Sequence, residues 1–289
     1  MKVIKAKTAG FCFGVKRAVD TVYKQVDTKC GQIYTYGPII HNEEVIKDMR
    51  DKGVIVLRSE EDLDMISQGT VIIRSHGVEK RIYEKIEQKG LRIVDATCPF
   101  VKKIHNIVSE KSGEGFHIII IGNPEHPEVV GIKGWAKDNV TVIQSAEDAE
   151  CFTADRKEKI CIVSQTTFNY NKFKDLVEIL RKKRYDNTVL NILNILNTIC
   201  NATEERQREA KNIAGEVDTM LVVGGRHSSN TQKLFEICKK ECGNTYYIQT
   251  PVDLDSEMFQ CSSYVGITAG ASTPNKIIEE VQEHVRIKF

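Results

Sequence analysis

Three cysteines that open similar segments are the residues best suited to chemistry. Cys98 lies between the apolar run Leu91–Val94 and a helical pattern of apolar residues, so it marks the junction of a strand and a helix. Pro99 suits the first position of that helix, and the positive end of the helix dipole favours a thiolate. The thiolate could be a nucleophile, a metal ligand or a small buried residue, and Cys98 alone leaves these alternatives open.

The arrangement recurs after Cys12 and Cys200, which also precede residues spaced as on one helical face. A polar turn follows each cysteine at nearly constant distance; the turns contain His41, His126 and Ser228, which lie 29, 28 and 28 residues after their cysteines. Second polar strand ends follow at 64, 68 and 72 residues, at His76, Thr166 and Ser272. The agreement predicts a threefold repeat, with segments 1–97, 98–199 and 200–289.

Short apolar runs rich in β-branched residues alternate with amphipathic helical stretches, which is typical of α/β chains with parallel sheets. The predicted strands are Val54–Leu57, Val71–Ile73, Leu91–Val94, Ile118–Ile121, Val140–Ile143, Ile160–Val163, Met220–Val223, Tyr246–Ile248 and Tyr264–Ile267. Because parallel sheets place ligands at the carboxyl ends of their strands, we expect a pseudo-threefold trefoil of three α/β domains with polar turns converging on one centre.

Three cysteines meeting at such a centre suit a cubane iron–sulfur cluster in which one iron lacks a cysteine ligand. An open metal position is expected of a catalytic site rather than a structural one. Zinc bound by three cysteines and a histidine is the competing chemistry. Zinc-binding cysteines usually come in close pairs, however, and these are separated by 86 and 102 residues.

The polar turns offer many hydrogen-bond donors and no lysine at the centre, which fits an anionic ligand such as a diphosphate. The candidate binding residues are His41, His76, His126, Ser228, Ser229, Asn230 and Ser272. Glu128 is, apart from Glu125, the only carboxylate in these turns, and it is a candidate proton source with Thr166 as a relay. The alternative is that Glu128 is an ordinary surface residue.

Bulk properties exclude several functional classes. Lys and Arg number 41 against 40 Asp and Glu, so a formal charge of +1 gives no electrostatic footprint for nucleic acid. The longest purely apolar runs, such as Ile118–Ile121, are far too short to span a bilayer, and the first residues lack a signal-peptide core. Nine scattered cysteines argue against a disulfide framework. We expect a cytoplasmic protein without nucleic-acid or membrane partners.

Eight short motifs resemble the 4-hydroxy-3-methylbut-2-enyl diphosphate reductase (LytB/IspH) family, and they occur in order along essentially the whole chain. They are Gly10–Val15, Ser75–Gly77, Asp95–Pro99, His126–Glu128, Ser164–Thr167, Asn197–Cys200, Ser228–Thr231 and Ala271–Pro274. The resemblance implies a trefoil of three α/β domains around an oxygen-sensitive [4Fe-4S] cluster. It further implies the last step of the non-mevalonate isoprenoid pathway, a two-electron, two-proton reductive dehydroxylation that yields isopentenyl and dimethylallyl diphosphate.

The resemblance also implies a role for each site residue. Cys12, Cys98 and Cys200 match the cluster ligands, and Glu128 matches the proton-delivering carboxylate, with Thr166 as its partner at the substrate hydroxyl. His126 belongs to the catalytic set as well. The diphosphate pocket is matched by His41, His76, His126, Ser228, Ser229, Asn230 and Ser272, and Thr166 joins them in the substrate-binding set. A ferredoxin or flavodoxin is the implied electron donor.

Two other functions remain open on the residues themselves: a zinc-dependent hydrolase or transferase acting on a phosphorylated substrate, and a non-catalytic phosphate-binding protein. One stretch departs from the family pattern. Residues Asn187–Asn197 form a near-triplet repeat of asparagine and aliphatic residues just before Cys200. It leaves the register at the end of the second segment open.

Overall fold

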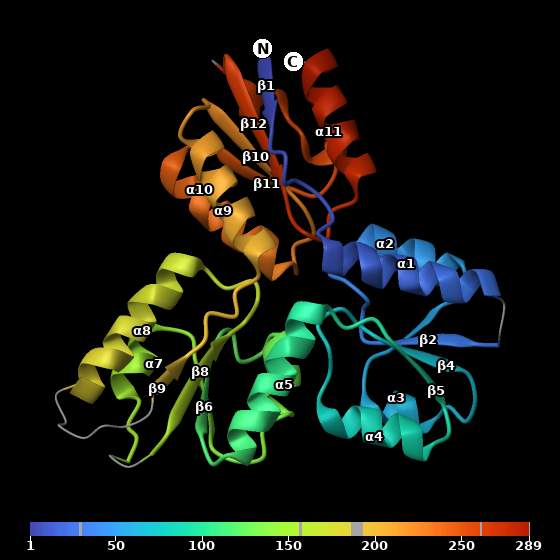
Figure 1. Ribbon diagram of the computed structural model, residues 1–289. Coiled ribbons are helices and arrows are strands. Elements are labelled where there is room, and N and C mark those ends of the chain that lie inside the picture. Colours follow the sequence, from blue (N-terminus) through green and yellow to red (C-terminus); the bar gives the residue numbers. More distant parts are fainter. Residues whose placement is uncertain (29–30, 156–157, 186–192, 261, 289) are drawn as a thin grey trace. The chain divides into compact units, whose positions relative to one another are not determined.

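The structure is a computed structural model that describes residues 1–28, 31–155, 158–185, 193–260 and 262–288. The chain forms two compact units. The first unit comprises residues 1–20, 40–52 and 200–289, and the second comprises residues 21–39 and 53–199. The first unit contains one four-stranded parallel sheet and the second contains two (Figure 1).

The sheet of the first unit has the strand order β1-β12-β10-β11. Its strands are β1 (Lys2–Lys5), β12 (Tyr264–Ala269), β10 (Thr219–Val223) and β11 (Thr245–Ile248). Side chains alternate across β10: Met220 and Val222 pack with α9 (Asn201–Ala214) and α10 (Ser229–Glu241), whereas Leu221 and Val223 pack with α11 (Asn275–Lys288). The unit also holds α2 (Glu43–Asp51), the first residues of α1 (Phe13–Thr28), and the 3₁₀ turns η1 (Pro251–Asp253) and η2 (Ser256–Phe259).

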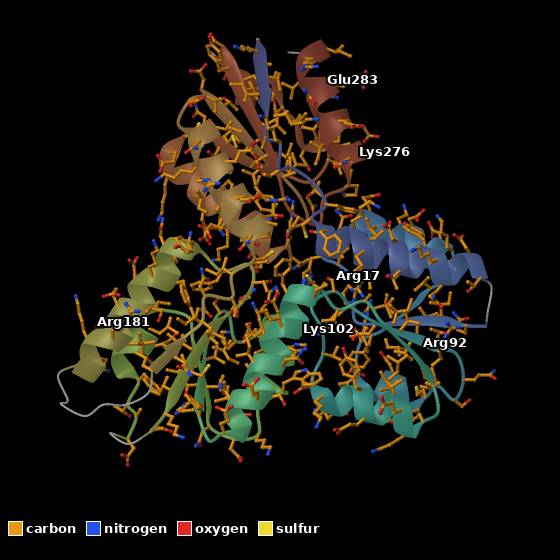
Figure 2. The ribbon with its side chains drawn as sticks, viewed as in Figure 1. Arg17, Arg92, Lys102, Arg181, Lys276 and Glu283 are labelled. Atoms are coloured by element: carbon orange, nitrogen blue, oxygen red, sulfur yellow. The ribbon has the colours of Figure 1, made fainter. Side chains whose placement is uncertain are left out.

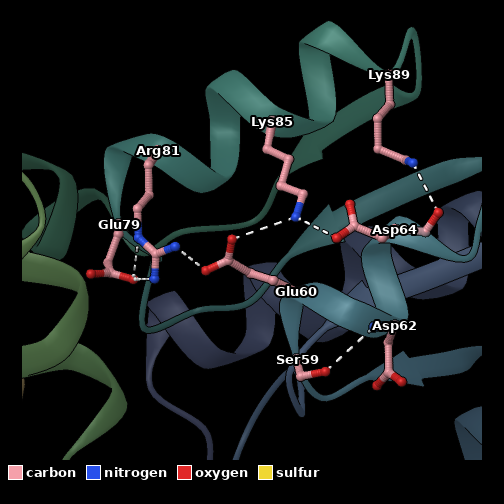
Figure 3. Close-up of polar contacts among 8 residues, drawn as sticks. All are labelled: Ser59, Glu60, Asp62, Asp64, Glu79, Arg81, Lys85 and Lys89. Carbon is pink, nitrogen blue, oxygen red and sulfur yellow. Dashed lines mark hydrogen bonds and ion pairs between the residues drawn. The ribbon is translucent and has the colours of Figure 1, made fainter.

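The first sheet of the second unit has the order β3-β2-β4-β5. Its strands are β3 (Ile55–Leu57), β2 (Ile33–Tyr36), β4 (Thr70–Ile73) and β5 (Arg92–Asp95), and its helices are α3 (Glu60–Asp64) and α4 (Lys80–Gln88). A line of ion pairs joins these two helices, as Figure 3 shows: Arg81 contacts Glu60 and Glu79, and Lys85 contacts Glu60 and Asp64. Exposed pairs of this kind contribute little to stability, so the apolar cluster beneath them carries the packing.

The other sheet has the order β7-β6-β8-β9. Its strands are β7 (Val140–Ile143), β6 (His117–Ile121), β8 (Ile160–Ser164) and β9 (Leu193–Ile195). Ile118 and Ile120 of β6 face α5 (Pro99–Gly113) and α6 (Pro127–Lys133), and Ile119 and Ile121 face α7 (Ala146–Cys151) and α8 (Tyr170–Tyr185). Arg181 lies on the exposed side of α8 and pairs with Glu178 at 3.0 Å (Figure 2).

Trp135 follows α6 and contacts elements that pack on both sheets of the second unit. Its indole Nε1 donates to the Val78 carbonyl at 2.9 Å, and its ring stacks on His105 with centroids 4.9 Å apart. Burial lowers the pKa of His105 to about 4, so this ring is neutral at physiological pH. His105 lies against Gly77, whose φ of +71° and close neighbours leave no room for a side chain.

The predicted α/β class and the threefold repeat are confirmed, because all three sheets share one strand topology. In each, the central strand β2, β6 or β10 ends five residues before His41, His126 or Ser228. A cysteine follows the outer strand β5, β9 or β1 of each sheet, so β1 supplies the fourth strand of the sheet that the last segment builds (Figure 1). The segment boundaries at 97/98 and 199/200 stay a prediction.

All nine predicted strands are present, and β1, β2 and β9 were not predicted. Part of the unexplained stretch Asn187–Asn197 now has an account, because Leu193–Ile195 pairs with β8 as an edge strand. Residues 187–192 lie outside the described residues. None of the helices in the described ranges combines the length and the hydrophobicity that a bilayer crossing needs.

Candidate active site

In the second unit, the cysteine at the start of α5 is fixed to the turn that follows β4. The backbone N–H of Cys98 donates to the Ser75 carbonyl at 2.9 Å. Ser75 is itself buried, and its hydroxyl donates to the Ile39 carbonyl at 2.9 Å. Pro99 occupies the first turn of α5, as the sequence predicts. Cys98 is therefore held at the turn that contains Ser75 and His76.

His76 and His126 lie edge to face, with ring centroids 5.5 Å apart and an interplanar angle of 80°. His126 caps the N-terminus of α6, where its Nδ1 accepts a hydrogen bond from the Glu128 backbone N–H at 3.1 Å. Because Nδ1 accepts, a neutral His126 ring carries its hydrogen on Nε2. The ring thus presents Nε2 as a donor.

Glu128 is buried, with 1% of its surface exposed, so it is not the surface residue of the alternative interpretation. Its Oε1 accepts from the backbone N–H of Thr166 at 2.6 Å, and its Oε2 accepts from the Thr166 hydroxyl at 2.8 Å. Burial raises the pKa of Glu128 to about 7, although the two hydrogen bonds from Thr166 act in the opposite direction. Glu128 therefore exchanges a proton near physiological pH.

In the first unit, three predicted residues meet around the turns after β10 and β12. The Ser272 hydroxyl lies 3.0 Å from the His41 carbonyl oxygen and 3.4 Å from the Ser228 hydroxyl oxygen. Gly225 passes so close to His41 that an added Cβ would lie 2.8 Å from the same carbonyl. The backbone is thus shaped to bring these two turns together, and the approach leaves no space for a larger residue than glycine.

The N-terminus of α10 adds donors to this cluster. Ser228 caps the helix by accepting from the Thr231 N–H at 3.3 Å, and Ser229 and Asn230 form its first turn. Asn230 is 5% exposed, and within the described ranges its side-chain nitrogen Nδ2 has no hydrogen-bond partner. A buried amide donor without a partner costs free energy unless a ligand accepts from it. A helix N-terminus favours an anion there.

Cys12 and Cys200 are the two predicted cysteines of the first unit. Cys12 donates its N–H to the Ala271 carbonyl at 3.3 Å, directly before Ser272, and its own carbonyl accepts the first bond of α1. Cys200 caps α9. Cys12, Cys98 and Cys200 are not disulfide-bonded and are half-buried, and each precedes a helix after the outer strand of a sheet.

The family model described as LytB protein matches residues 3–286. The chain belongs to the LytB protein family. Among relatives of the family, a protein of Caldanaerobacter subterraneus subsp. tengcongensis named 4-hydroxy-3-methylbut-2-enyl diphosphate reductase is 46% identical over 287 residues, covering 99% of this chain and 97% of the relative. A Geobacter sulfurreducens protein of the same name is 42% identical over 286 residues, covering 99% and 97%.

Two solved structures resemble this chain. The E-1-hydroxy-2-methyl-but-2-enyl-4-diphosphate reductase of Plasmodium falciparum matches with a TM-score of 0.90 and 29% identity, covering 99% of this chain and 87% of that one. A structure described as (E)-4-hydroxy-3-methyl-but-2-enyl diphosphate reductase, the terminal enzyme of the non-mevalonate pathway, matches with a TM-score of 0.70 and 40% identity, covering 99% of both chains. The α/β fold of this LytB protein is therefore that of known reductases.

Two charged residues near the LytB cysteines escaped the sequence analysis. Arg206 of α9 is 3% exposed, and Glu209 follows it at three residues. The sequence did hold a signal for Arg206: it lies at helical spacing with Ala210 and Ile213, so it interrupts an apolar stripe with a charge. A buried charge needs compensation, which marks such a position for closer study.

Proposed function

We propose that this chain is a 4-hydroxy-3-methylbut-2-enyl diphosphate reductase. In the proposed reaction two electrons and two protons are consumed, the allylic C–O bond breaks, and the oxygen leaves as water. The hydrocarbon part takes up the other proton, giving isopentenyl or dimethylallyl diphosphate. The observation that carries the proposal is the buried Glu128–Thr166 pair, which adjoins His126 and, through it, His76. The residue before His76, Ser75, accepts the N–H of Cys98.

The cofactor we propose is a [4Fe-4S] cluster held by Cys12, Cys98 and Cys200. The donor set fits, since the three cysteines are not disulfide-bonded, are half-buried and lie at helix N-termini that favour thiolates. When bound, such a cluster would supply electrons and an iron without a cysteine ligand as a Lewis acid. Membership of the reductase family supports this ligand set.

Glu128 and Thr166 are proposed to deliver the proton on which the departure of water depends. When Glu128 is ionised, the Thr166 hydroxyl donates to its Oε2 at 2.8 Å. When Oε2 carries a proton, it can donate to the Thr166 oxygen, and the hydroxyl hydrogen then turns outward. Thr166 can therefore donate its hydroxyl hydrogen to the substrate hydroxyl only while Glu128 is protonated. A pKa of about 7 keeps both forms populated at neutral pH.

The diphosphate is proposed to bind at the polar turns, where charge-assisted hydrogen bonds are worth roughly 1.5–3 kcal/mol each. In the first unit the support is the unpartnered buried amide of Asn230 together with Ser228, Ser229, Ser272 and His41. In the second unit it is His76 and the donor Nε2 of His126. The polar turns would fix the substrate so that its hydroxyl reaches Thr166.

A ferredoxin or flavodoxin is the proposed electron donor, and the cytoplasm is the proposed compartment. The support for both is membership of the LytB family. The proposal is independent of which of the two donors serves the enzyme.

The decisive experiment is anaerobic purification followed by iron and acid-labile sulfide analysis and a turnover assay. We expect brown protein with about four irons per chain, and conversion of the allylic alcohol diphosphate when a low-potential reductant is supplied. Substituting serine for Cys12, Cys98 or Cys200 should lower the iron content and abolish turnover. Colourless protein that cannot be reconstituted with iron and sulfide would refute the proposal.

The same measurements separate the competing functions. Stoichiometric zinc without sulfide would favour a zinc-dependent hydrolase or transferase. Pyrophosphate binding that survives loss of all three cysteines, with no turnover, would favour a non-catalytic binding protein.

A further inference from the structure

The helix that Cys200 opens reaches both segments that fix Cys12. Arg206 and Glu209 are three residues apart on α9 and therefore lie on neighbouring parts of its surface. Cys12 and Cys200 are both in the first unit, so the contacts that link them belong to one compact body. Glu209 binds the segment before Cys12, and Arg206 binds the end of the strand β12.

Glu209 holds the segment that leads into Cys12. Its Oε1 accepts from the Lys7 N–H at 2.8 Å, and its Oε2 accepts from the N–H and the hydroxyl of Thr8 at 2.9 and 2.5 Å. Burial alone would raise the pKa of Glu209, but these hydrogen bonds keep that pKa below its usual value. Glu209 is thus ionised at neutral pH, and three charge-assisted bonds anchor the segment four residues before Cys12.

Arg206 holds the other side of Cys12. Its guanidinium Nη1 donates to the carbonyl of Ala269, the last residue of β12, at 2.7 Å. Two residues further on, the Ala271 carbonyl accepts the N–H of Cys12 at 3.3 Å. The position of Cys12 therefore depends on a strand end that Arg206 ties to the helix of Cys200.

The charge of Arg206 needs a counter-charge. Burying a guanidinium is costly unless negative groups lie near it, and its acceptor Ala269 is neutral. The negative groups that act on it are Cys12, Glu209 and Cys200. Burial lowers the pKa of Arg206 to about 10, and these three groups oppose the lowering, so it stays charged at neutral pH. Arg206 lies on the helix that Cys200 opens, and its guanidinium holds the strand end that leads to the acceptor of the Cys12 N–H. A buried cation there favours the more negative redox state of a group that the thiolates of Cys12 and Cys200 would hold.

We infer that Arg206 and Glu209 are positioning residues that tie Cys12 to Cys200, and that the Arg206 charge raises the reduction potential of the iron–sulfur group these thiolates hold. The inference rests on the proposed function. It concerns how strongly the group is held and how easily it is reduced, which can be measured separately from turnover.

The test compares Arg206→Met and Arg206→Gln with Arg206→Lys and with Arg208→Met, which changes an exposed arginine on the same helix. After anaerobic reconstitution, iron and sulfide are counted and the midpoint potential is measured by a redox titration followed by electron paramagnetic resonance. We expect both neutral variants to shift the potential to more negative values. Arg206→Lys should keep the wild-type potential and Arg208→Met should match wild type throughout.

Positioning is tested by the rate at which a chelator removes iron. Glu209→Gln, Arg206→Met and Arg206→Gln should all lose iron several-fold faster than wild type. A wild-type potential in folded Arg206→Met or Arg206→Gln would overturn the charge effect. If circular dichroism shows that both neutral variants are unfolded, the midpoint potential of Arg206→Lys becomes the test. A shift of that potential to more negative values would also overturn the charge effect. Wild-type iron release in Glu209→Gln would overturn the positioning role, whereas failure of wild type to bind iron would overturn the proposed function instead.

Discussion

Thr166 donates one hydrogen bond to each carboxylate oxygen of Glu128, from its backbone N–H to Oε1 at 2.6 Å and from its hydroxyl to Oε2 at 2.8 Å. The two donors stabilise the ionised carboxylate, while burial stabilises the protonated one. The balance leaves the pKa of Glu128 at about 7, where a general acid is most effective at neutral pH. The pair joins the loop after β8 to the first turn of α6.

Glu128→Gln should leave substrate binding intact and slow turnover by roughly 10²–10⁴, the usual effect of losing a positioned acid. Glutamine keeps both contacts, because its oxygen can accept from the Thr166 N–H and its amide can donate to the Thr166 hydroxyl. Single-turnover kinetics on reduced enzyme measure the chemical step, and calorimetry measures substrate affinity. The matched control is Glu125→Gln, an exposed carboxylate in the same turn; normal turnover in Glu128→Gln would remove Glu128 from the mechanism.

Thr166→Val should move the alkaline limb of the pH–rate profile upward. The hydroxyl donor that lowers the pKa of Glu128 is lost, while the backbone N–H donor remains, so the pKa rises above about 7. Since the proton donor must be protonated, activity then declines at higher pH than in wild type, at a reduced maximal rate because the relay is gone. Thr166→Ser keeps the hydroxyl, so it should show the wild-type alkaline limb and the wild-type maximal rate. An unchanged alkaline limb in Thr166→Val would show that Glu128 does not set it.

Glu128 should make the metal-free protein less stable as pH rises. Its pKa is about 7 in the folded chain and 4.5 ordinarily, so between these values the folded state binds more protons than the unfolded state. Stability attributable to the neutral carboxyl is complete below pH 4.5 and is lost as pH rises to about 7, a total of about 3 kcal/mol. Urea unfolding of wild type and Glu128→Gln measures it: their difference in unfolding free energy should change by about 2–3 kcal/mol between pH 5 and pH 8. Parallel pH profiles would contradict the buried, shifted carboxyl.

The sheets were largely predictable because their strands are continuous apolar runs, as in Ile118–Ile121, which is buried on both faces. The three missed strands carry a weaker signal. Lys2–Lys5 has lysine at both ends, Ile33–Tyr36 is only partly buried, and Leu193–Ile195 is an asparagine-containing edge. β1 and β9 are edge strands, which need fewer apolar residues because one side of each is open, so the hydrophobic pattern alone does not find them. β2 is an inner strand, and it was missed because its one aliphatic residue, Ile33, is followed by tyrosine and threonine.

The site was less predictable than the fold, because burial decides what a polar residue does. Nothing local in the sequence separates Glu128 from the exposed Glu125; the difference comes from Thr166, which lies 38 residues further along the chain. Arg206 was missed for a related reason. Its function depends on Ala269 and Cys12, which are distant in sequence and adjacent only after β1 joins β12.

Asn230→Asp should weaken diphosphate binding strongly while changing the fold little. Asparagine and aspartate have the same shape, but the exchange turns the buried, unpartnered donor Nδ2 into an acceptor with a negative charge. Losing a hydrogen bond to a charged group costs roughly 1.5–3 kcal/mol, and repulsion adds to it, so the dissociation constant should rise by at least about tenfold. Titration calorimetry with inorganic pyrophosphate measures this without involving redox chemistry. Asn212→Asp, an exposed position on α9, adds the same charge elsewhere in the first unit and should leave affinity unchanged. Equal affinities in the two variants would mean that Asn230 does not contact the diphosphate, and the N-terminus of α10 would then have to be left out of the pocket.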